Sequence, residues 1–349
     1  MGAQRKEHSG YLLIHTGQIG DNLLTTPVIR SIRKADPGAY IAFLTTPGNY
    51  HVFSYNPYLD EILILDKSMP VSAYTRFLLN LRKRRFDVVL DYLCNPRSAF
   101  ITWFSDAAHR LGYDLRFRTY AYTTVVRRDP APKYSVDFKY DLLRALGMDT
   151  DGFSLDLVVP DAAHRFAAEF MDSIQKTAGP VITVSPVSRR AYKQWDPERF
   201  ARLSDMLIGS MNANLIFLWG PGEKTYVQQI MYMMKYKPHL SPQTPTIKEL
   251  GAILKRADMH IGNDNGIKHI AIAMGTPTVT VHGPSDPVSW EPPGSPFHVW
   301  IKKDTGCGKC KPRNCPYDMK CLAAIQPDEV FGLAELLLKK INGTIRNAG

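Results

Sequence analysis

The chain has 349 residues, of which 44% are hydrophobic and 22% are charged, a balance that excludes a disordered chain, a collagen and a disulfide-rich miniprotein. Lys and Arg outnumber Asp and Glu by 43 to 33, and the resulting net charge of +10 favours partners that carry phosphate or carboxylate groups. The length predicts two domains of ordinary size or one large α/β unit.

The N-terminal residues predict a cytoplasmic protein. Residues 1–10 are polar, and the apolar run that follows them is too short for a signal peptide. No apolar run in the chain approaches the roughly 18 residues of a membrane-spanning helix. We therefore expect a compartment in which thiols stay reduced.

Short apolar runs alternate with helical patterns along the whole chain, which predicts parallel sheets covered by helices on both faces. In the first half the runs predict strands at 11–15, 40–44, 62–65 and 87–90, with helices at 22–35 and 72–84. The alternation restarts after Pro160, with strands at 181–184, 215–218, 259–261 and 278–281 and helices at 197–208, 223–235, 247–255 and 267–273. These two sets predict two doubly wound α/β domains, 1–160 and 161–349, that face a cleft. A last helix at 331–341 belongs to the second domain or returns to the first.

A glycine-containing loop follows the first predicted strand. Gly17 and Gly20 let the backbone turn tightly and approach a ligand closely, although the loop has neither the GxGxxG nor the P-loop pattern. The helix that begins at Asn22 directs its free N–H groups and positive dipole end toward this loop. Asp21 has two interpretations: an N-cap that stabilises the helix by roughly 1 kcal/mol, or a general base at the carboxyl end of the first strand.

Loops of the second domain also follow strands. The loop at 185–195 carries Arg189, Arg190 and Lys193, which suit a diphosphate, with a solvated loop as the alternative. Glu223 opens a helix, either as a cap or as an acceptor of ribose hydroxyls.

A turn rich in Asn, Asp and Gly follows the strand at 259–261 and runs into a helix, so that backbone donors converge there. The turn contains Asp264, Asn265 and Gly266, and His269 lies near the start of the helix, where a lone histidine is more often structural than catalytic. Together these loops predict a nucleotide site at the carboxyl ends of the strands.

Four cysteines form a C-x2-C-x4-C-x5-C pattern: Cys307, Cys310, Cys315 and Cys321. A structural zinc ion, free thiols and disulfides are the three alternatives, and any metal would be remote from catalysis. Residues 72–133 hold twelve Lys or Arg and five Asp or Glu, a net charge of +7. This stretch is either a set of solvated faces or a surface for an anionic partner at an anionic membrane leaflet, and a family resemblance carried by other segments implies that this partner is a glycolipid.

Four segments together resemble a known family, namely 17–27, 193–195, 263–269 and 283–287, with the sequences GQIGDNLLTTP, KQW, NDNGIKH and GPSDP. They are similar to the motifs of glycosyltransferase family 9, the ADP-heptose:lipopolysaccharide heptosyltransferases. The similarity runs from about residue 11 to about residue 335. It implies a GT-B fold, made of two Rossmann-like domains, and an inverting sugar transfer that needs no metal or other cofactor for catalysis.

The resemblance also implies roles for individual residues. Asp21 matches the family's catalytic base, in a loop with Gly17, Gly20 and Asn22. In the second domain, which would hold the nucleotide sugar, the matching donor-binding residues are Ser188, Arg189, Lys193, Glu223, Asp264, Asn265, Gly266 and His269. Asn265 departs from the family, where Thr or Ser is frequent, and Lys268 is either an additional charge beside the diphosphate or a solvated residue. In the first domain, which would hold the acceptor, Arg97 resembles a basic residue that contacts the acceptor.

We therefore expect transfer of a heptose from ADP-heptose to the inner core of lipopolysaccharide, by a cytoplasmic enzyme peripheral to the inner membrane. An inverting transferase that uses another nucleotide sugar is the first alternative. A basic nucleic-acid-binding protein is the second, and it predicts a basic groove with stacking aromatics. We expect no nucleic-acid partner.

Overall fold

The computed structural model describes residues 9–115, 117–174, 176–307, 310 and 312–348. The chain divides into two compact units between Val158 and Val159. Each unit is described by itself below.

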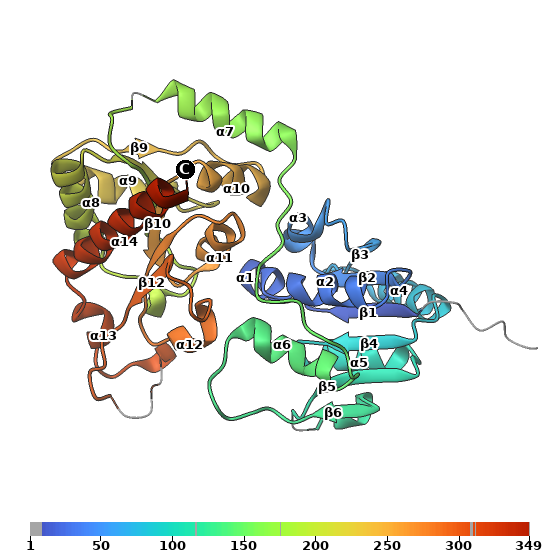
Figure 1. Ribbon diagram of the computed structural model, residues 1–349. Coiled ribbons are helices and arrows are strands. Elements are labelled where there is room, and N and C mark those ends of the chain that lie inside the picture. The colour runs from blue at the N-terminus through green and yellow to red at the C-terminus, as the bar shows by residue number, and fades with distance from the viewer. Residues whose placement is uncertain (1–8, 116, 175, 308–309, 311, 349) are drawn as a thin grey trace, which may run out of the picture. The chain divides into compact units, whose positions relative to one another are not determined.

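The first unit is built on the following elements: β1 (Gly10–Ile14), α1 (Ile19–Leu23), α2 (Thr26–Ala35), β2 (Tyr40–Thr45), η1 (Pro47–Asn49), α3 (Tyr50–Phe53), β3 (Glu61–Ile64), α4 (Val71–Lys83), β4 (Val88–Asp91), α5 (Pro96–Phe104), β5 (His109–Tyr113), η2 (Thr119–Ala121), β6 (Thr124–Val126) and α6 (Ser135–Arg144). Its six strands form one parallel sheet in the order β3-β2-β1-β4-β5-β6. All five residues of β1 are buried, because helices cover the sheet on both faces (Figure 1).

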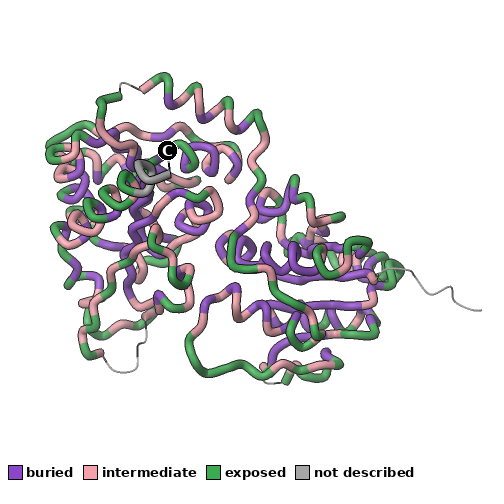
Figure 2. Tube along the Cα trace, viewed as in Figure 1, coloured by how far each residue is buried: buried purple, intermediate pink, exposed green. Residues whose placement is uncertain are grey.

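The second unit repeats this plan with α7 (Asp161–Ser173), β7 (Val181–Ser185), η3 (Ala191–Lys193), α8 (Pro197–Met211), β8 (Asn214–Phe217), α9 (Lys224–Tyr232), β9 (His239–Leu240), α10 (Ile247–Lys255), β10 (Met259–Asn263), α11 (Gly266–Ala273), β11 (Thr278–Val281), α12 (Pro287–Trp290), β12 (His298–Ile301), η4 (Pro312–Asn314), α13 (Lys320–Ala323) and α14 (Pro327–Ala348). Its parallel sheet has the order β12-β11-β10-β7-β8-β9, which is the same topology as in the first unit. Figure 2 shows the buried strands inside each unit and the exposed residues on the helices and loops around them.

The eight strands predicted from the sequence all lie in these two sheets, and the α/β class is confirmed. The prediction missed β5, β6, β9 and β12, which lie at or next to the sheet edges. The residues of β6, β9 and β12 are half-buried or exposed, and β5 begins with exposed His109 and half-buried Arg110, so these strands lack the continuous apolar run of a central strand.

The helix predicted at 22–35 is wrong as a single element. It is divided into α1 and α2 near Thr25, the residue that precedes α2. Pro27 lies in the first turn of α2, where its missing N–H costs no helical hydrogen bond. In the middle of one continuous helix the same proline would remove such a bond, which explains the break.

The last helix, α14, contacts α8, β11 and β12, and its Val330, Ala334 and Leu337 lie in the hydrophobic core of the second unit. These contacts place it in that unit. Within the described residues, no helix is both long enough and apolar enough to cross a membrane.

Candidate active site

The order of strands reverses between β1 and β4 in the first unit and between β7 and β10 in the second. Open α/β sheets bind ligands at such points, outside the carboxyl ends of the strands. Asp21 follows β1 and Arg97 follows β4, whereas Lys193 follows β7 and Asp264 follows β10. The predicted residues of each unit therefore gather at the edge of the sheet where a ligand is expected.

Asp21 is the third residue of α1, and its Oδ2 accepts a hydrogen bond from the backbone N–H of Gln18 at 3.3 Å. The N-cap interpretation of Asp21 is wrong in position, because Gln18 occupies the N-cap. The carboxylate is only half-buried. Within the described residues, this hydrogen bond is the one made by its side chain, so Oδ1 is available to accept a proton.

The rest of the loop packs tightly on His15. The N–H of Gly17 donates to His15 Nδ1 at 3.1 Å, and a Cβ added to Gly17 would lie 2.5 Å from the Cε1 atom of this ring. Burial, reinforced by nearby Lys139, lowers the pKa of His15 to about 3, so its ring is neutral and Nδ1 can accept. Asn22 is buried and structural: it donates to Gln18 O at 2.7 Å and accepts from Thr45 Oγ1 at 3.1 Å. Gly20, the second residue of α1, is buried as well.

Lys139 is a buried cation beside this loop that the sequence did not single out. It comes from α6, which is distant in the chain, and it is almost fully buried. Burial lowers the pKa of Lys139, while the carboxylate of Asp21 acts in the opposite direction and raises it. The first unit thus places an ammonium group close enough to Asp21 for the two charges to interact.

The loop after β4 is built around Asp91, which is fully buried. Its carboxylate accepts from Tyr122 Oη at 2.9 Å and from the N–H groups of Leu93 and Cys94 at 3.0 and 2.8 Å. Burial raises the pKa of the Cys94 thiol to about 12, so this cysteine is inert at neutral pH. The loop is therefore held firmly where it leads into α5, and Arg97 is exposed in the first turn of that helix.

In the second unit, two asparagine amides join the loop after β7 to the turn after β10. Asn263 accepts from Trp195 N at 2.9 Å and donates to Pro186 O at 2.8 Å. Asn265 donates to Val187 O at 3.0 Å, and its Oδ1 caps α11 by accepting from the N–H groups of Ile267 and Lys268. Asn265 therefore has a structural role that a Ser or Thr side chain could fill only in part.

A buried chain of charges lies beside this turn. Asp264 accepts from Lys193 Nζ at 2.5 Å on one oxygen and from Lys268 Nζ at 2.8 Å on the other. Lys268 also lies 3.0 Å from a carboxylate oxygen of Glu291. Lys268 is fully buried, so both interpretations offered for it, a charge at the diphosphate and a solvated residue, are replaced by an internal ion pair.

These charges balance one another. Burial alone would raise the pKa of Asp264, but Lys268 and Lys193 outweigh it and hold this pKa well below its ordinary value. Burial lowers the pKa of His282, whose Nε2 lies 2.7 Å from Glu291. The imidazole is thus neutral and donates from Nε2, while Nδ1 accepts from the Ser285 hydroxyl at 3.1 Å. Two lysines and two carboxylates give this network no net charge.

Lys193 is the cation of the network with access to solvent, since 21% of its side chain is exposed. Its ammonium also lies 5.4 Å from the centre of the Trp290 ring, and His269 is 6.1 Å from the same ring. Gly266 is the first residue of α11, at the positive end of the helix dipole, and the N–H groups of Ile267 and Lys268 that follow it already donate to Asn265. This group of residues can bind an anion with Lys193 and the amino end of α11, beside an aromatic surface.

The remaining predicted donor residues have local partners. Ser188 is buried, with its N–H bonded to Gln194 Oε1 at 3.1 Å, and Arg189 beside it is exposed. Glu223 occupies the N-cap of α9 and its carboxylate accepts from Gly220 N at 2.7 Å. The capping interpretation of Glu223 is therefore correct in position only, because its carboxylate accepts from Gly220 and, among the described residues, from no N–H group of α9.

All five cysteines are free thiols. Among the described residues, no group of three or more Cys, His, Asp or Glu side chains is arranged to hold a metal ion. The structure thus gives no support to the zinc or disulfide alternatives for Cys307, Cys310, Cys315 and Cys321.

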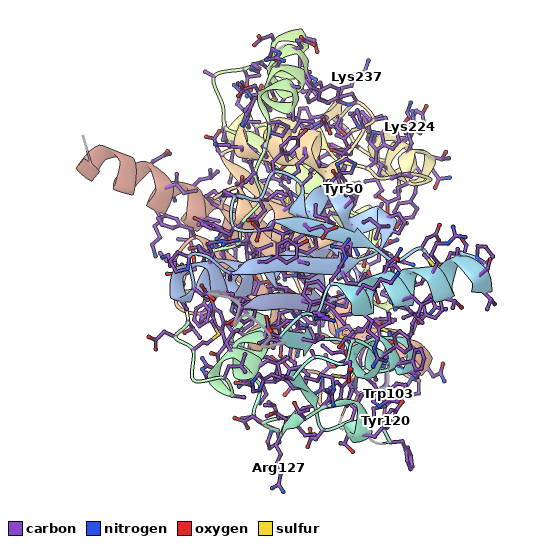
Figure 3. The ribbon with its side chains drawn as sticks, turned by 90° about the vertical axis from the view of Figure 1, so that its right-hand side faces the viewer. Tyr50, Trp103, Tyr120, Arg127, Lys224 and Lys237 are labelled. Atoms are coloured by element: carbon purple, nitrogen blue, oxygen red, sulfur yellow. The ribbon has the colours of Figure 1, made fainter. Side chains whose placement is uncertain are left out.

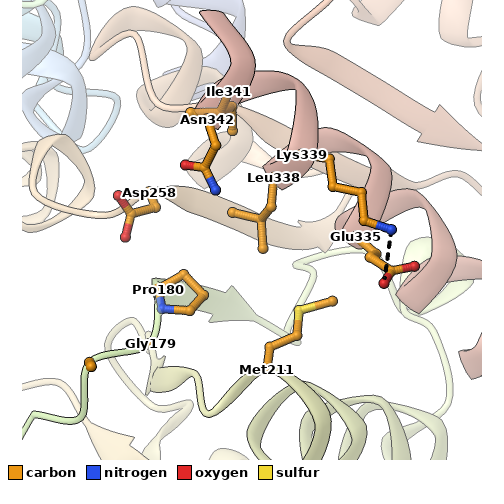
Figure 4. A pocket seen from close by; sticks show the side chains of 10 residues that line it. Gly179, Pro180, Met211, Asp258, Glu335, Leu338, Lys339, Ile341 and Asn342 are labelled. Carbon is orange, nitrogen blue, oxygen red and sulfur yellow. Dashed lines mark ion pairs between the residues drawn. The ribbon is translucent and has the colours of Figure 1, made fainter. Parts of the chain in front are cut away.

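A pocket in the second unit lies away from all these residues. It is lined by Pro180 and Asp258, which precede β7 and β10, and by residues of α14 including Glu335, Leu338 and Lys339 (Figure 4). It therefore opens at the amino ends of the strands, the edge opposite to the charge network, and it adds nothing to the candidate site.

Sequence reasoning missed Lys139, Trp290 and Glu291. A buried lysine in a helix gives no local signal, because only the fold brings it near Asp21. Trp290 and Glu291 follow the noted segment 283–287 directly, so extending that segment by a few residues would have found them.

Comparisons with known proteins agree with this geometry. The model of "Glycosyltransferase family 9 (heptosyltransferase)" matches residues 74–321. Lipopolysaccharide heptosyltransferase 3 of Escherichia coli is 25% identical over 284 residues, which are 78% of this chain and 83% of that protein.

Solved structures share the fold. The family 9 glycosyl transferase of Veillonella parvula has a TM-score of 0.81 at 23% identity, over 95% of this chain and 97% of that chain. E. coli ADP-heptose lps heptosyltransferase II has a TM-score of 0.76 at 19% identity, over 95% and 99%. The two Rossmann-like sheets are thus those of a GT-B fold, as expected from the sequence. Because the family model covers more than half of the chain, the protein belongs to glycosyltransferase family 9, the heptosyltransferases.

Proposed function

We propose that this enzyme moves a heptose from ADP-heptose to the inner core of lipopolysaccharide, with inversion at the anomeric carbon and without a catalytic metal ion. The names of its relatives support the donor and the acceptor class, since they include a lipopolysaccharide heptosyltransferase and an ADP-heptose lps heptosyltransferase. The first unit would bind the acceptor and the second the nucleotide sugar. The enzyme would work in the cytoplasm, peripheral to the inner membrane.

The observation that carries the mechanism is the accessible carboxylate of Asp21 in the loop after β1, with Oδ1 available. An acceptor hydroxyl is a weak nucleophile, and a positioned carboxylate that removes its proton during attack accelerates the reaction. In a single displacement, the acceptor oxygen bonds to the anomeric carbon as the bond to the diphosphate breaks. The product then has the inverted configuration.

The departing ADP gains negative charge in the transition state, and fixed positive groups lower the barrier by stabilising it. The proposal assigns this task to Lys193, Arg189 and the amino end of α11. Asp264 would hold Lys193 in place, and Ser188, Asn265, Gly266 and His269 would shape the surrounding surface. Glu223 would face the donor ribose, and Arg97 would contact an anionic group of the acceptor.

The decisive experiment is product analysis with a panel of nucleotide sugars and a set of truncated lipopolysaccharide acceptors, in the presence of EDTA. We expect one heptose to be added from ADP-heptose, in the inverted configuration. Transfer only from another nucleotide sugar would overturn the donor assignment and support the alternative transferase. Loss of activity in EDTA that returns with a divalent metal would overturn the metal-independent mechanism. Family membership already disfavours the nucleic-acid-binding alternative.

A further inference from the structure

We propose that the outer surface of α4, α5 and η2 in the first unit docks onto a phospholipid bilayer that is rich in anionic headgroups. We call this surface the α5 face, and we define it by its exposed apolar residues Leu79, Phe100, Trp103 and Tyr120 and its exposed cations Arg76, Lys83 and Arg97. The inference rests on the peripheral membrane location in the proposed function and deepens it by naming the surface and the lipid class. Vesicle binding needs neither donor nor acceptor, so it is tested separately from sugar transfer.

The first observation is the exposure of large apolar side chains on neighbouring elements. Phe100 and Trp103 are 37% and 49% exposed, and they follow Arg97 at steps of three residues, so all three lie on one side of α5. The rings of Phe100 and Trp103 are 5.9 Å apart. Soluble proteins seldom expose a contiguous apolar patch without a binding role.

The patch extends from α5 to both of its neighbours, since α5 contacts α4 on one side and η2 on the other. Leu79 on α4 is 49% exposed and Tyr120 on η2 is 62% exposed. Trp103 and Tyr120 come to the surface on the same face of the first unit (Figure 3). Four large apolar side chains are thus exposed on three elements that contact one another.

The second observation is the charge around this patch. The segments 67–86, 92–105 and 115–128, which contain α4, α5 and η2, have no Asp or Glu at all. Arg76, Lys83 and Arg97 are exposed, and within the described residues no carboxylate forms an ion pair with them. Arg82 is partly neutralised by Asp106 at 2.7 Å, and it also covers the Phe104 ring. The patch is therefore bordered mainly by positive charge, and the nearby carboxylate of Asp106 is paired with Arg82.

This combination fits the surface of an anionic bilayer. Aromatic side chains, Trp and Tyr above all, favour the headgroup level of a membrane, and cations near anionic lipids each strengthen binding about fivefold. A partner protein of ordinary mixed charge would meet no complementary acidic group on the α5 face. The charge complementarity therefore selects the bilayer as the occupant.

The orientation is consistent with a lipid-linked acceptor, a point that rests on the proposed function. α5 begins just after β4, and the last residue of β4, Asp91, is in register with Ile14 at the end of β1. Arg97 thus marks the end of the α5 face that lies at the carboxyl edge of the sheet, the edge that also carries Asp21. Docking through this face would bring that edge to the membrane surface.

The test is sedimentation of the full chain with vesicles that contain phosphatidylglycerol, compared with vesicles of phosphatidylcholine alone. We expect binding to the anionic vesicles, weakened by added salt, and at least tenfold weaker binding of the double variant F100S/W103S. The double variant R76Q/K83Q should weaken binding by a similar factor without removing apolar side chains. Neither variant changes a residue assigned to catalysis or substrate binding, so transfer to a short water-soluble acceptor should be unchanged.

Matched controls come from the second unit. Tyr232→Ser removes an aromatic side chain that is 85% exposed, and the pair K176Q/K237Q removes two exposed cations; both should bind vesicles like the wild type. Circular dichroism melting checks that each variant is folded. If F100S/W103S does not fold, R76Q/K83Q still tests the proposal. The proposal is overturned if the wild type does not bind anionic vesicles. It is also overturned if the α5-face variants bind these vesicles as strongly as the control variants do. It is also overturned if sedimentation velocity shows that these variants abolish a dimer instead.

Discussion

The ammonium of Lys193 lies 2.5 Å from a carboxylate oxygen of Asp264, although the two residues are 71 positions apart and follow different strands. Asp264 in turn is shared with Lys268, which is fully buried. A carboxylate by itself would repel a diphosphate. Its role in this site is thus to hold Lys193, the lysine of the network that reaches solvent. Lys193 would then bind the anion, while Lys268 only neutralises buried carboxylates, and this difference can be tested.

Replacing each lysine should separate binding from stability. Lys193→Ala should weaken ADP affinity by about tenfold or more, since a charge-assisted contact is lost, with little change in unfolding free energy. Lys268→Met should lower the unfolding free energy by about 3–5 kcal/mol, because it leaves Asp264 and Glu291 buried without their cation. Calorimetric titration and denaturant unfolding measure the two effects. Equal effects of both substitutions on stability would contradict this division.

Asp21→Asn keeps the size of the side chain and an oxygen that can accept from Gln18, but it removes the proposed base. We expect the rate of transfer to fall by about 10²–10⁴-fold, because general-base catalysis is lost, while ADP affinity stays at the wild-type level. Steady-state kinetics and calorimetric titration check the two parts. A folded Asp21→Asn or Asp21→Ala enzyme with undiminished transfer would show that another group is the base.

Lys139→Met tests whether the buried cation near Asp21 supports transfer. Transfer should fall, because the positive charge that interacts with the Asp21 carboxylate is gone. Stability should be unchanged or higher, since an apolar side chain replaces a buried charge. A loss of stability with undiminished transfer would instead assign Lys139 a purely structural role.

Gly17 and Gly48 form a matched pair of glycines in the first unit. A Cβ on Gly17 would lie 2.5 Å from the His15 ring, whereas a Cβ on Gly48 would have nothing within 4 Å. Gly17→Ala should therefore cost about 1–3 kcal/mol of stability and displace the loop that carries Asp21, with a loss of transfer. Gly48→Ala should leave both unchanged. Thermal melting and kinetic assays of the two variants provide the comparison.

His260 should make the second unit sensitive to acid. Its ring is buried between Thr183 Oγ1 and Ser185 Oγ, each 3.0 Å from one of its nitrogens, and burial lowers its pKa from 6.5 to about 3. Between these two values the unfolded chain binds more protons than the folded one, so stability rises with pH in this window. As the pH falls from 6.5 toward 3, His260 should cost about 3–5 kcal/mol of unfolding free energy.

Denaturant unfolding at a series of pH values measures this dependence. His260→Asn should flatten it, although His15, whose pKa is also lowered to about 3, leaves a contribution from the first unit. A slope that is the same in the wild type and the variant would show that His260 is not the source.

The candidate site was largely predictable, because its residues lie in short segments directly after strands. The loop at 17–27 and the turn at 263–269 were recognisable from glycine, asparagine and aspartate at fixed positions, which local backbone geometry requires. Lys268 shows the limit of this method. A lysine beside Ile267 in an amphipathic helix gives no local signal of burial, yet the packed fold buries Lys268 completely and pairs it with Asp264 and Glu291.

By itself, the sequence determined the alternation of strands and helices, eight of the strands and the resemblance to one family. These follow from local signals: apolar runs, glycines and short motifs. Only the tertiary structure decided that Lys139 lies near Asp21 and that Lys193 is held by Asp264. Such contacts join segments far apart in the chain, and the burial that sets their charges and pKa values exists only once the sheets and helices have packed.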